Sequence, residues 1–145
     1  VRPGDLGLVT FDDAQAVVSL GERLDPAEVV QRLLRRPCGG RTNLHAGLAT
    51  GAGLLAGARD PRRTAVVISD GLYTLGPDPR SLASGFGSLH VLRTNGVPLP
   101  AGVWINPVRM ASEDLARLGG GRLVPVATFQ ELPRRMLELA EAILR

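Results

Sequence analysis

The chain has 145 residues, enough for a single domain to bury a core without disulfides or a structural metal. Its apolar fraction is 44% but its aromatic fraction only 3%, so the core must be aliphatic and stacking on bases or sugars is not expected. All 17 basic residues are arginine, against 14 acidic residues, and they are scattered or paired along the chain rather than gathered in a stripe. This pattern argues against a nucleic-acid partner.

Cysteine content and hydropathy indicate the cellular compartment. The single cysteine, Cys38, can form no internal disulfide and no thiolate metal cluster, which fits a reducing compartment. No apolar run approaches the roughly 18 residues of a membrane span, and no charged and apolar leader precedes Gly4. We therefore expect a cytoplasmic protein.

The first third of the chain predicts a hairpin and a helix. Asp5–Phe11 and Ala16–Leu20 read as two strands joined by a solvated polar turn at Asp12 and Asp13. An amphipathic helix begins after Asp25-Pro26 and ends before Pro37.

A glycine-rich loop, 37–43, leads into a predicted helix at Leu44–Ala58. This helix is rich in alanine and glycine, and each interior glycine costs about 1 kcal/mol of helix stability relative to alanine. We expect close packing against a sheet to offset that cost.

The stretch Arg63–Gly71, RTAVVISDG, contains a continuous apolar run, Ala65–Ile68, and ends in an acid and a glycine. Such a run predicts a strand buried on both faces, as in parallel sheets. Because ligands collect outside the carboxyl ends of parallel strands, Asp70 is a candidate functional residue.

The remaining segments alternate between helices and strands, with a poorly patterned region between Asn95 and Met110. The predicted segments are a loop at Gly71–Pro79, a short helix at Arg80–Ala83, a strand at Leu89–Leu92, a short strand at Val103–Ile105, a helix at Glu113–Leu118 capped by Ser112 and ended by glycines 119 to 121, a strand at Leu123–Val126, and a terminal helix to about Leu144. This order predicts an α/β three-layer sandwich with a mostly parallel, doubly wound sheet and one antiparallel edge hairpin.

Two oxygen-bearing residues, Thr42 and Asp70, are expected at one rim of this sheet. A hydroxyl and a carboxylate suit a hard cation such as Mg²⁺, with Mn²⁺ as an alternative, although two oxygens are too few for six-coordination. Each residue also has a purely structural interpretation. Thr42 with Asn43 can cap the following helix, and Asp70-Gly71 can be a turn that ends the strand.

Several stretches resemble the von Willebrand factor A family over essentially the whole chain. They are GDLGLVTFDD, GGRTNLHAGL, VVISDG and GGGRLVPV. The resemblance implies a metal-ion-dependent adhesion site in which Thr42 and Asp70 are ligands. The first-strand Asp-x-Ser-x-Ser of that site is absent, because the chain begins at what resembles the second strand of the family. We therefore expect a single domain over 1–145 that is incomplete at its N-terminus, with weak or absent Mg²⁺ binding if Val1 is the true start.

The resemblance further implies a non-catalytic protein-binding module. In the family, the cation keeps one position open for a carboxylate of the partner, and bacterial members suggest an AAA+ ATPase of the MoxR or chelatase type. Arg41, Asn43 and Gly71 are the expected partner-contacting residues. Arg41 adds a positive charge beside the cation site or, alternatively, meets an acidic residue of the partner. The alternative is a metal-free scaffold of the same fold.

Three further motifs suggest catalysis or a cofactor, and each lacks part of the pattern that this chemistry requires. Gly51–Ala56 fits the dinucleotide pattern G-x-G-x-x-A and would suggest a nucleotide-binding oxidoreductase, but it falls mid-helix rather than after a strand. Cys38 and His45 lack an orienting third group, and Ser69 lacks the G-x-S-x-G elbow. His90, inside an apolar strand, is expected to be a satisfied core or edge histidine.

Overall fold

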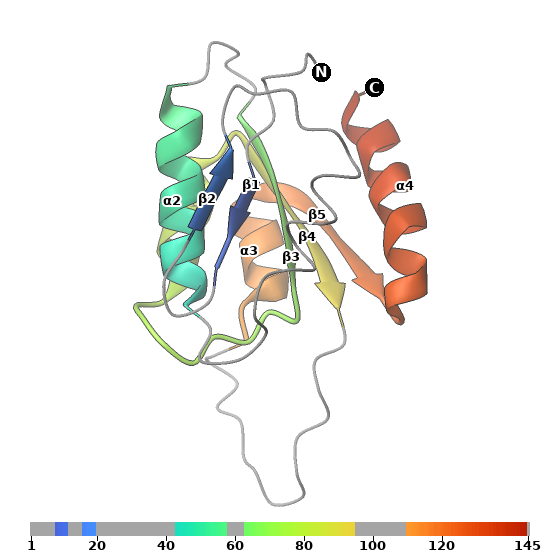
Figure 1. The fold of residues 1–145 in the computed structure, drawn as a ribbon, viewed down its shortest axis with the longest axis horizontal. Helices are drawn as coiled ribbons and strands as arrows, with labels where there is room; N and C mark the ends of the chain where they lie inside the picture. Colours follow the sequence, from blue (N-terminus) through green and yellow to red (C-terminus); the bar gives the residue numbers. More distant parts are fainter. Residues whose placement is uncertain (1–7, 12–15, 20–42, 58–62, 95–109, 145) are drawn as a thin grey trace, which may run out of the picture. The chain divides into compact units, whose positions relative to one another are not determined.

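The computed structural model describes residues 8–11, 16–19, 43–57, 63–94 and 110–144 (Figure 1). The chain divides into two compact units. The first comprises Val1–Pro61 and Tyr73–Asp78, and the second comprises Arg62–Leu72 and Pro79–Arg145. The predicted helix before Pro37, the Asp12-Asp13 turn and the strand at Val103–Ile105 lie outside the described residues.

The first unit contains an antiparallel strand pair and a helix. β1 (Leu8–Thr10) pairs with β2 (Ala16–Ser19), which agrees with the predicted hairpin strands. In the described residues these strands form a two-stranded sheet of their own, so their place at the edge of the parallel sheet stays a prediction. Helix α2 (Leu44–Ala56) begins where predicted and ends two residues earlier.

Close packing explains the glycine at position 47 of α2 but not those at 51 and 53. A Cβ on Gly47 would lie 2.7 Å from Cγ of Phe11, the residue after β1, so this contact requires glycine. Among the described residues, no atom lies within 4 Å of where a Cβ on Gly51 or Gly53 would stand. Among the described residues, close approach therefore accounts for Gly47 alone of these three glycines, and for Gly51 and Gly53 the expectation stays a prediction.

The second unit is built on a three-stranded parallel sheet, in the order β3-β4-β5. Its strands are β3 (Thr64–Ser69), β4 (Ser88–Thr94) and β5 (Gly120–Val126), each longer than predicted by one to three residues at an end. Ile68 pairs with Leu92, and Leu92 pairs with Val124, so these three side chains share one face. The unit is thus an α/β structure of the predicted class.

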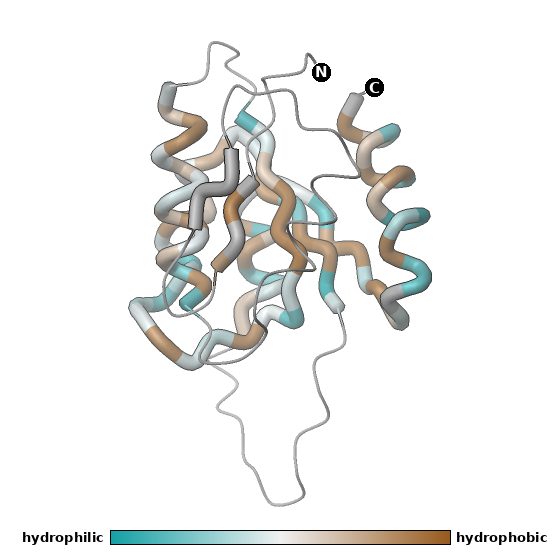
Figure 2. The backbone as a smooth tube through the Cα atoms, viewed as in Figure 1, coloured by the Kyte–Doolittle hydropathy of each residue, from teal (hydrophilic) through white to brown (hydrophobic). Residues whose placement is uncertain are grey.

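Helices α3 and α4 pack on this sheet. Helix α4 (Leu132–Leu144) contributes Leu139 to a cluster with Leu92 and Val126, and brown and teal alternate along it in Figure 2 as expected for an amphipathic helix. Helix α3 (Ser112–Leu118) contacts β4 and β5. The unit also contains the short 3-10 helices η1 (Pro79–Gly85) and η3 (Phe129–Glu131). In the described part of the chain, no helix has the length and apolarity that crossing a membrane requires.

The glycines at 119 to 121 end α3, as predicted: Gly119 is its C-cap, and Gly120 and Gly121 begin β5. A Cβ on Gly119 would lie 2.5 Å from Cβ of Leu89, and one on Gly121 would lie 2.0 Å from the carbonyl oxygen of Leu89. The pairing of β4 with β5 shifts at this point, and the backbone N–H of Arg122 donates to Nδ1 of His90 over 3.0 Å. His90 is 7% exposed and is therefore the satisfied buried histidine that was predicted.

Strand β3 differs from the sequence-based expectation in its burial. It is not buried on both faces: Val67 is 8% exposed, but Val66 and Ile68 are each 40% exposed. The reason is that β3 is an outer strand of the described sheet, while α4 packs over Leu92 and the strand beyond it. The expectation of burial on both faces is therefore wrong.

The cap of α3 also differs from the prediction. The N-cap residue is Ala111, which makes no side-chain capping bond, and Ser112 is the first helical residue. Ser112 is 4% exposed because its side chain packs against the backbone that follows β3.

Candidate functional site

The candidate site begins where β3 ends. Asp70 follows Ser69 directly and is half-buried, with its Oδ1 accepting the backbone N–H of Leu72 over 3.0 Å. The Ser69 hydroxyl accepts the N–H of Gly71 at the same distance. These two short-range bonds define a turn at Ser69–Leu72, called here the Asp70 turn, in which the carboxylate is oriented by its own backbone.

The Asp70 turn is held against the chain that enters α3. Gly71 has φ +82°, a conformation that favours glycine, and a Cβ there would lie 2.7 Å from Cβ of Ser112. Its carbonyl oxygen accepts the N–H of Ala111 over 2.9 Å, and Leu72 forms an isolated antiparallel bridge with Met110. The expected site residue Gly71 therefore has a backbone role in this structure.

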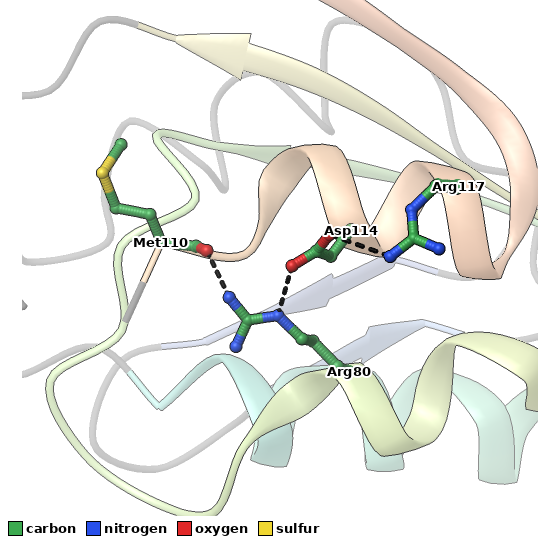
Figure 3. A network of polar contacts seen from close by, with 4 residues as sticks. All are labelled: Arg80, Met110, Asp114 and Arg117. Atoms are coloured by element: carbon green, nitrogen blue, oxygen red, sulfur yellow. Dashed lines mark hydrogen bonds and ion pairs between the residues drawn. The ribbon is translucent and has the colours of Figure 1, made fainter. Parts of the chain in front are cut away.

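Arg80, in η1, connects this entering segment to α3, and sequence reasoning missed it (Figure 3). Its Nη2 donates to the carbonyl oxygen of Met110, and its Nε donates to Oδ2 of Asp114 over 2.7 Å. Arg117 donates to Oδ1 of the same carboxylate over 3.1 Å. Hydrogen bonds from Arg80 and Arg117 hold the pKa of Asp114 below its ordinary value. We call these four residues the Arg80 network.

Asn43, in the first unit, caps a helix. Its Oδ1 accepts the backbone N–H of Ala46 over 2.9 Å at the start of α2, as the capping interpretation of this loop predicted. Gly76, at φ +86°, lies so close that a Cβ would be 2.4 Å from the same oxygen. Asn43 is half-buried, and its side chain lies between the start of α2 and Gly76.

Arg41 and Thr42 lie outside the described residues, so the structure does not bring Thr42 and Asp70 together or separate them. Their pairing as cation ligands stays a prediction. Contacts of a partner with Arg41, Asn43 or Gly71 are likewise untested.

The donor chemistry at Asp70 fits a hard divalent cation, but the described donor set is incomplete. Within the described part of the chain, Asp70 Oδ2 has no hydrogen-bond partner, so this oxygen is available to a ligand. No group of three or more His, Cys, Asp or Glu side chains among the described residues could hold a metal ion. A six-coordinate cation would therefore need Thr42, other chain oxygens or water.

The competing motifs gain no support from the structure. Gly51–Ala56 lies wholly inside α2, so the dinucleotide pattern lacks the preceding strand that it needs. Ser69 uses its hydroxyl within the Asp70 turn. Cys38, the proposed partner of His45, lies outside the described residues.

Comparison with known proteins shows likeness of fold. No family model matches the chain, and no curated protein gives a significant match. A crystal structure of an aerotolerance-related membrane protein from Bacteroides fragilis, with multiple mutations to serine, has a TM-score of 0.66 at 18% identity and matches 94% of this chain and 78% of its own. That of the conserved hypothetical protein BatB from Bacteroides thetaiotaomicron has a TM-score of 0.65 at 16% identity, with 95% and 78% matched. At these identities the chain shares the α/β fold of these proteins, which is consistent with the von Willebrand factor A-like fold that the sequence resembles.

Proposed function

We propose that this chain is a non-catalytic protein-binding domain in which Asp70 contributes one ligand of a divalent cation, Mg²⁺ or alternatively Mn²⁺. The observation that carries the proposal is the geometry of the Asp70 turn. The carboxylate follows a strand of a parallel sheet, one oxygen is fixed by the N–H of Leu72, and the other has no partner within the described residues. Strand ends of this kind are where α/β proteins bind ligands.

Thr42 is the second ligand in this proposal. Thr42 directly precedes Asn43, whose Oδ1 accepts the N–H of Ala46 at the start of α2. The assignment of Thr42 as a ligand follows the sequence resemblance. When bound, the cation would supply an electrophilic position that accepts a carboxylate oxygen of the partner. Arg41 would contribute a positive charge beside that carboxylate.

The finer parts of the proposal follow the sequence resemblance. They are a doubly wound three-layer sandwich, and a protein partner such as an AAA+ ATPase of the MoxR or chelatase type. The layer arrangement is supported by two residues of β4 on opposite faces: Leu92 packs with α4, whereas Leu89 contacts Gly119 at the end of α3. The partner assignment is an analogy between similar sequences.

Calorimetric titration with Mg²⁺ and with Mn²⁺ tests the cation site. Because the described donor set is incomplete, we expect weak but saturable binding to the chain and none to Asp70→Ala. Glu141→Ala is a matched control, since it also removes one carboxylate but from an exposed position on α4. Absence of binding to the folded chain, or unchanged binding to Asp70→Ala, would contradict the proposal.

A metal-free interaction domain of the same fold is the second candidate. It is favoured by the apolar surface of α4, where Leu137 is 61% exposed and Met136 43% exposed. Folded chain that binds neither cation would favour this candidate, because apolar surface on an amphipathic helix can bind a partner without any ion.

A further inference from the structure

We infer that Arg80 is a positioning residue for Asp70, acting through the backbone of Met110 and Ala111. The inference rests on the proposed cation site and names a residue that helps to hold it in shape. Among the described residues, no hydrogen bond or ion pair joins Arg80 directly to Asp70; the connection runs through three successive contacts.

The first contact joins Arg80 to the entry of α3. The guanidinium donates to the carbonyl oxygen of Met110 and to Oδ2 of Asp114, and its side chain is only 18% exposed (Figure 3). A guanidinium can satisfy both acceptors because its donors form a rigid planar fork. The segment from Met110 to Asp114 is thereby fixed at both ends to one side chain of η1.

The second contact joins this segment to the Asp70 turn. Met110 pairs with Leu72 in the isolated bridge, in which the N–H of Ala111 donates to the carbonyl oxygen of Gly71. The third contact lies within the turn, where Leu72 donates its N–H to Oδ1 of Asp70. Displacement of the Met110 carbonyl would therefore loosen the bond that orients the carboxylate.

Charge and geometry predict opposite effects of removing Arg80 on cation binding. Loss of a positive charge near a cation site strengthens cation binding or, when screened, leaves it unchanged. Loss of a positioning contact weakens it. The sign of the change therefore distinguishes a positioning role from simple electrostatics.

The experiment compares Arg80→Gln and Arg80→Lys with the control Arg117→Gln, which removes a donor to Asp114 and leaves the bond to Met110 in place. With Mn²⁺ as the probe, we expect at least threefold weaker binding to both Arg80 variants and a change below twofold for the control. Arg80→Lys is expected to bind Mn²⁺ as weakly as Arg80→Gln, because an ammonium lacks the planar fork that reaches both Asp114 and the carbonyl oxygen of Met110.

Amide hydrogen exchange supplies a readout that needs no metal. We expect exchange of the Leu72 and Ala111 amides to be at least fivefold faster in Arg80→Gln than in Arg117→Gln, with Val67 and Val91 unchanged as reporters of an intact sheet. Equal exchange in the two variants would overturn the inference. If the parent chain binds no Mn²⁺ but exchange changes as expected, the cation site fails while the positioning of the Asp70 turn by Arg80 stands.

Discussion

Gly71 and Ser112 approach so closely that a Cβ on Gly71 would lie 2.7 Å from Cβ of Ser112 and 3.0 Å from its backbone nitrogen. The glycine also has a positive φ of 82°. Two separate costs therefore oppose any side chain at this position, one from the backbone conformation and one from overlap with the start of α3.

Gly71→Ala is expected to destabilise the chain by about 2 to 4 kcal/mol, because the left-handed conformation costs about 1 to 2 kcal/mol and overpacking a similar amount or more. Urea denaturation followed by circular dichroism measures the change. Gly85→Ala is the control, since no described atom lies within 4 Å of its Cβ position, and it should change stability by less than about 0.5 kcal/mol. Similar losses in both variants would show that the contact with Ser112 is not the cause.

His90 is expected to make stability depend on pH. Burial, and secondarily the charge of Arg122, lower its pKa from the ordinary value of 6.5. The unfolded chain therefore binds more protons than the folded chain as pH falls below about 6.5. The stability that neutral His90 contributes should be fully present above that pH, and the free energy of unfolding should decrease below it. Denaturation at pH 7.5 and pH 5.5 measures this loss.

Two replacements of His90 separate its charge from its hydrogen bond. His90→Leu removes the acceptor of the Arg122 N–H and should cost about 1 to 3 kcal/mol at pH 7.5, whereas His90→Asn offers another acceptor and should cost less. Both variants should lose the part of the pH dependence assigned to His90. If the free energy of unfolding of both variants depended on pH as strongly as that of the parent chain, the pH dependence would belong to another group.

The α2 glycines provide a matched pair on one helix. Gly53→Ala should stabilise the chain by up to about 1 kcal/mol, because no described atom approaches its Cβ position and alanine is the better helix former. Gly47→Ala should destabilise it by about 1 to 3 kcal/mol, because the methyl group would overlap the ring of Phe11. Thermal denaturation measures both changes. Midpoint temperatures that shifted in the same direction for Gly47→Ala and Gly53→Ala would contradict this explanation.

The strand that Asp70 follows could be predicted from sequence because its signal is local. The apolar run at 65–68, the acid that follows it and the glycine at position 71 are adjacent, and the structure places them in β3 and the Asp70 turn. The capping of α2 by Asn43 is equally local, since its partner is three residues away.

The features that could not be predicted depend on partners far apart in the sequence. Arg80 and Asp114 are separated by 34 residues, and nothing near either one indicates the other. Ser112 looks like a cap from sequence alone, but contact with Gly71 buries it one position inside α3. Exposure of one face of β3 likewise depends on which strand is outermost in the sheet, which an apolar run does not encode.

Asn43→Ala tests the structural role of a residue expected to contact a partner. Loss of the cap should cost about 1 kcal/mol, and Asn43→Ser, which keeps an acceptor at the N-cap, should restore most of it. Denaturation of both variants measures the difference. If both were as stable as the parent chain, the bond to the Ala46 N–H would contribute nothing to stability.

Ile68 and Leu92 are paired in register on adjacent strands, yet their surroundings differ. Leu92 is fully buried beneath α4, whereas Ile68 is 40% exposed. Leu92→Ala should therefore cost about 2 to 5 kcal/mol, as expected for a buried large-to-small change. Ile68→Ala should cost about half as much or less, because part of that side chain already contacts water.

Denaturation in urea compares the two variants under identical conditions, and Ile68→Val serves as a control that keeps the β-branched shape. A loss of less than about 1 kcal/mol is expected for Ile68→Val. Equal losses for Ile68→Ala and Leu92→Ala would mean that Ile68 is covered in solution, since a side chain exposed to water on one face cannot lose as much apolar contact as one enclosed on all sides.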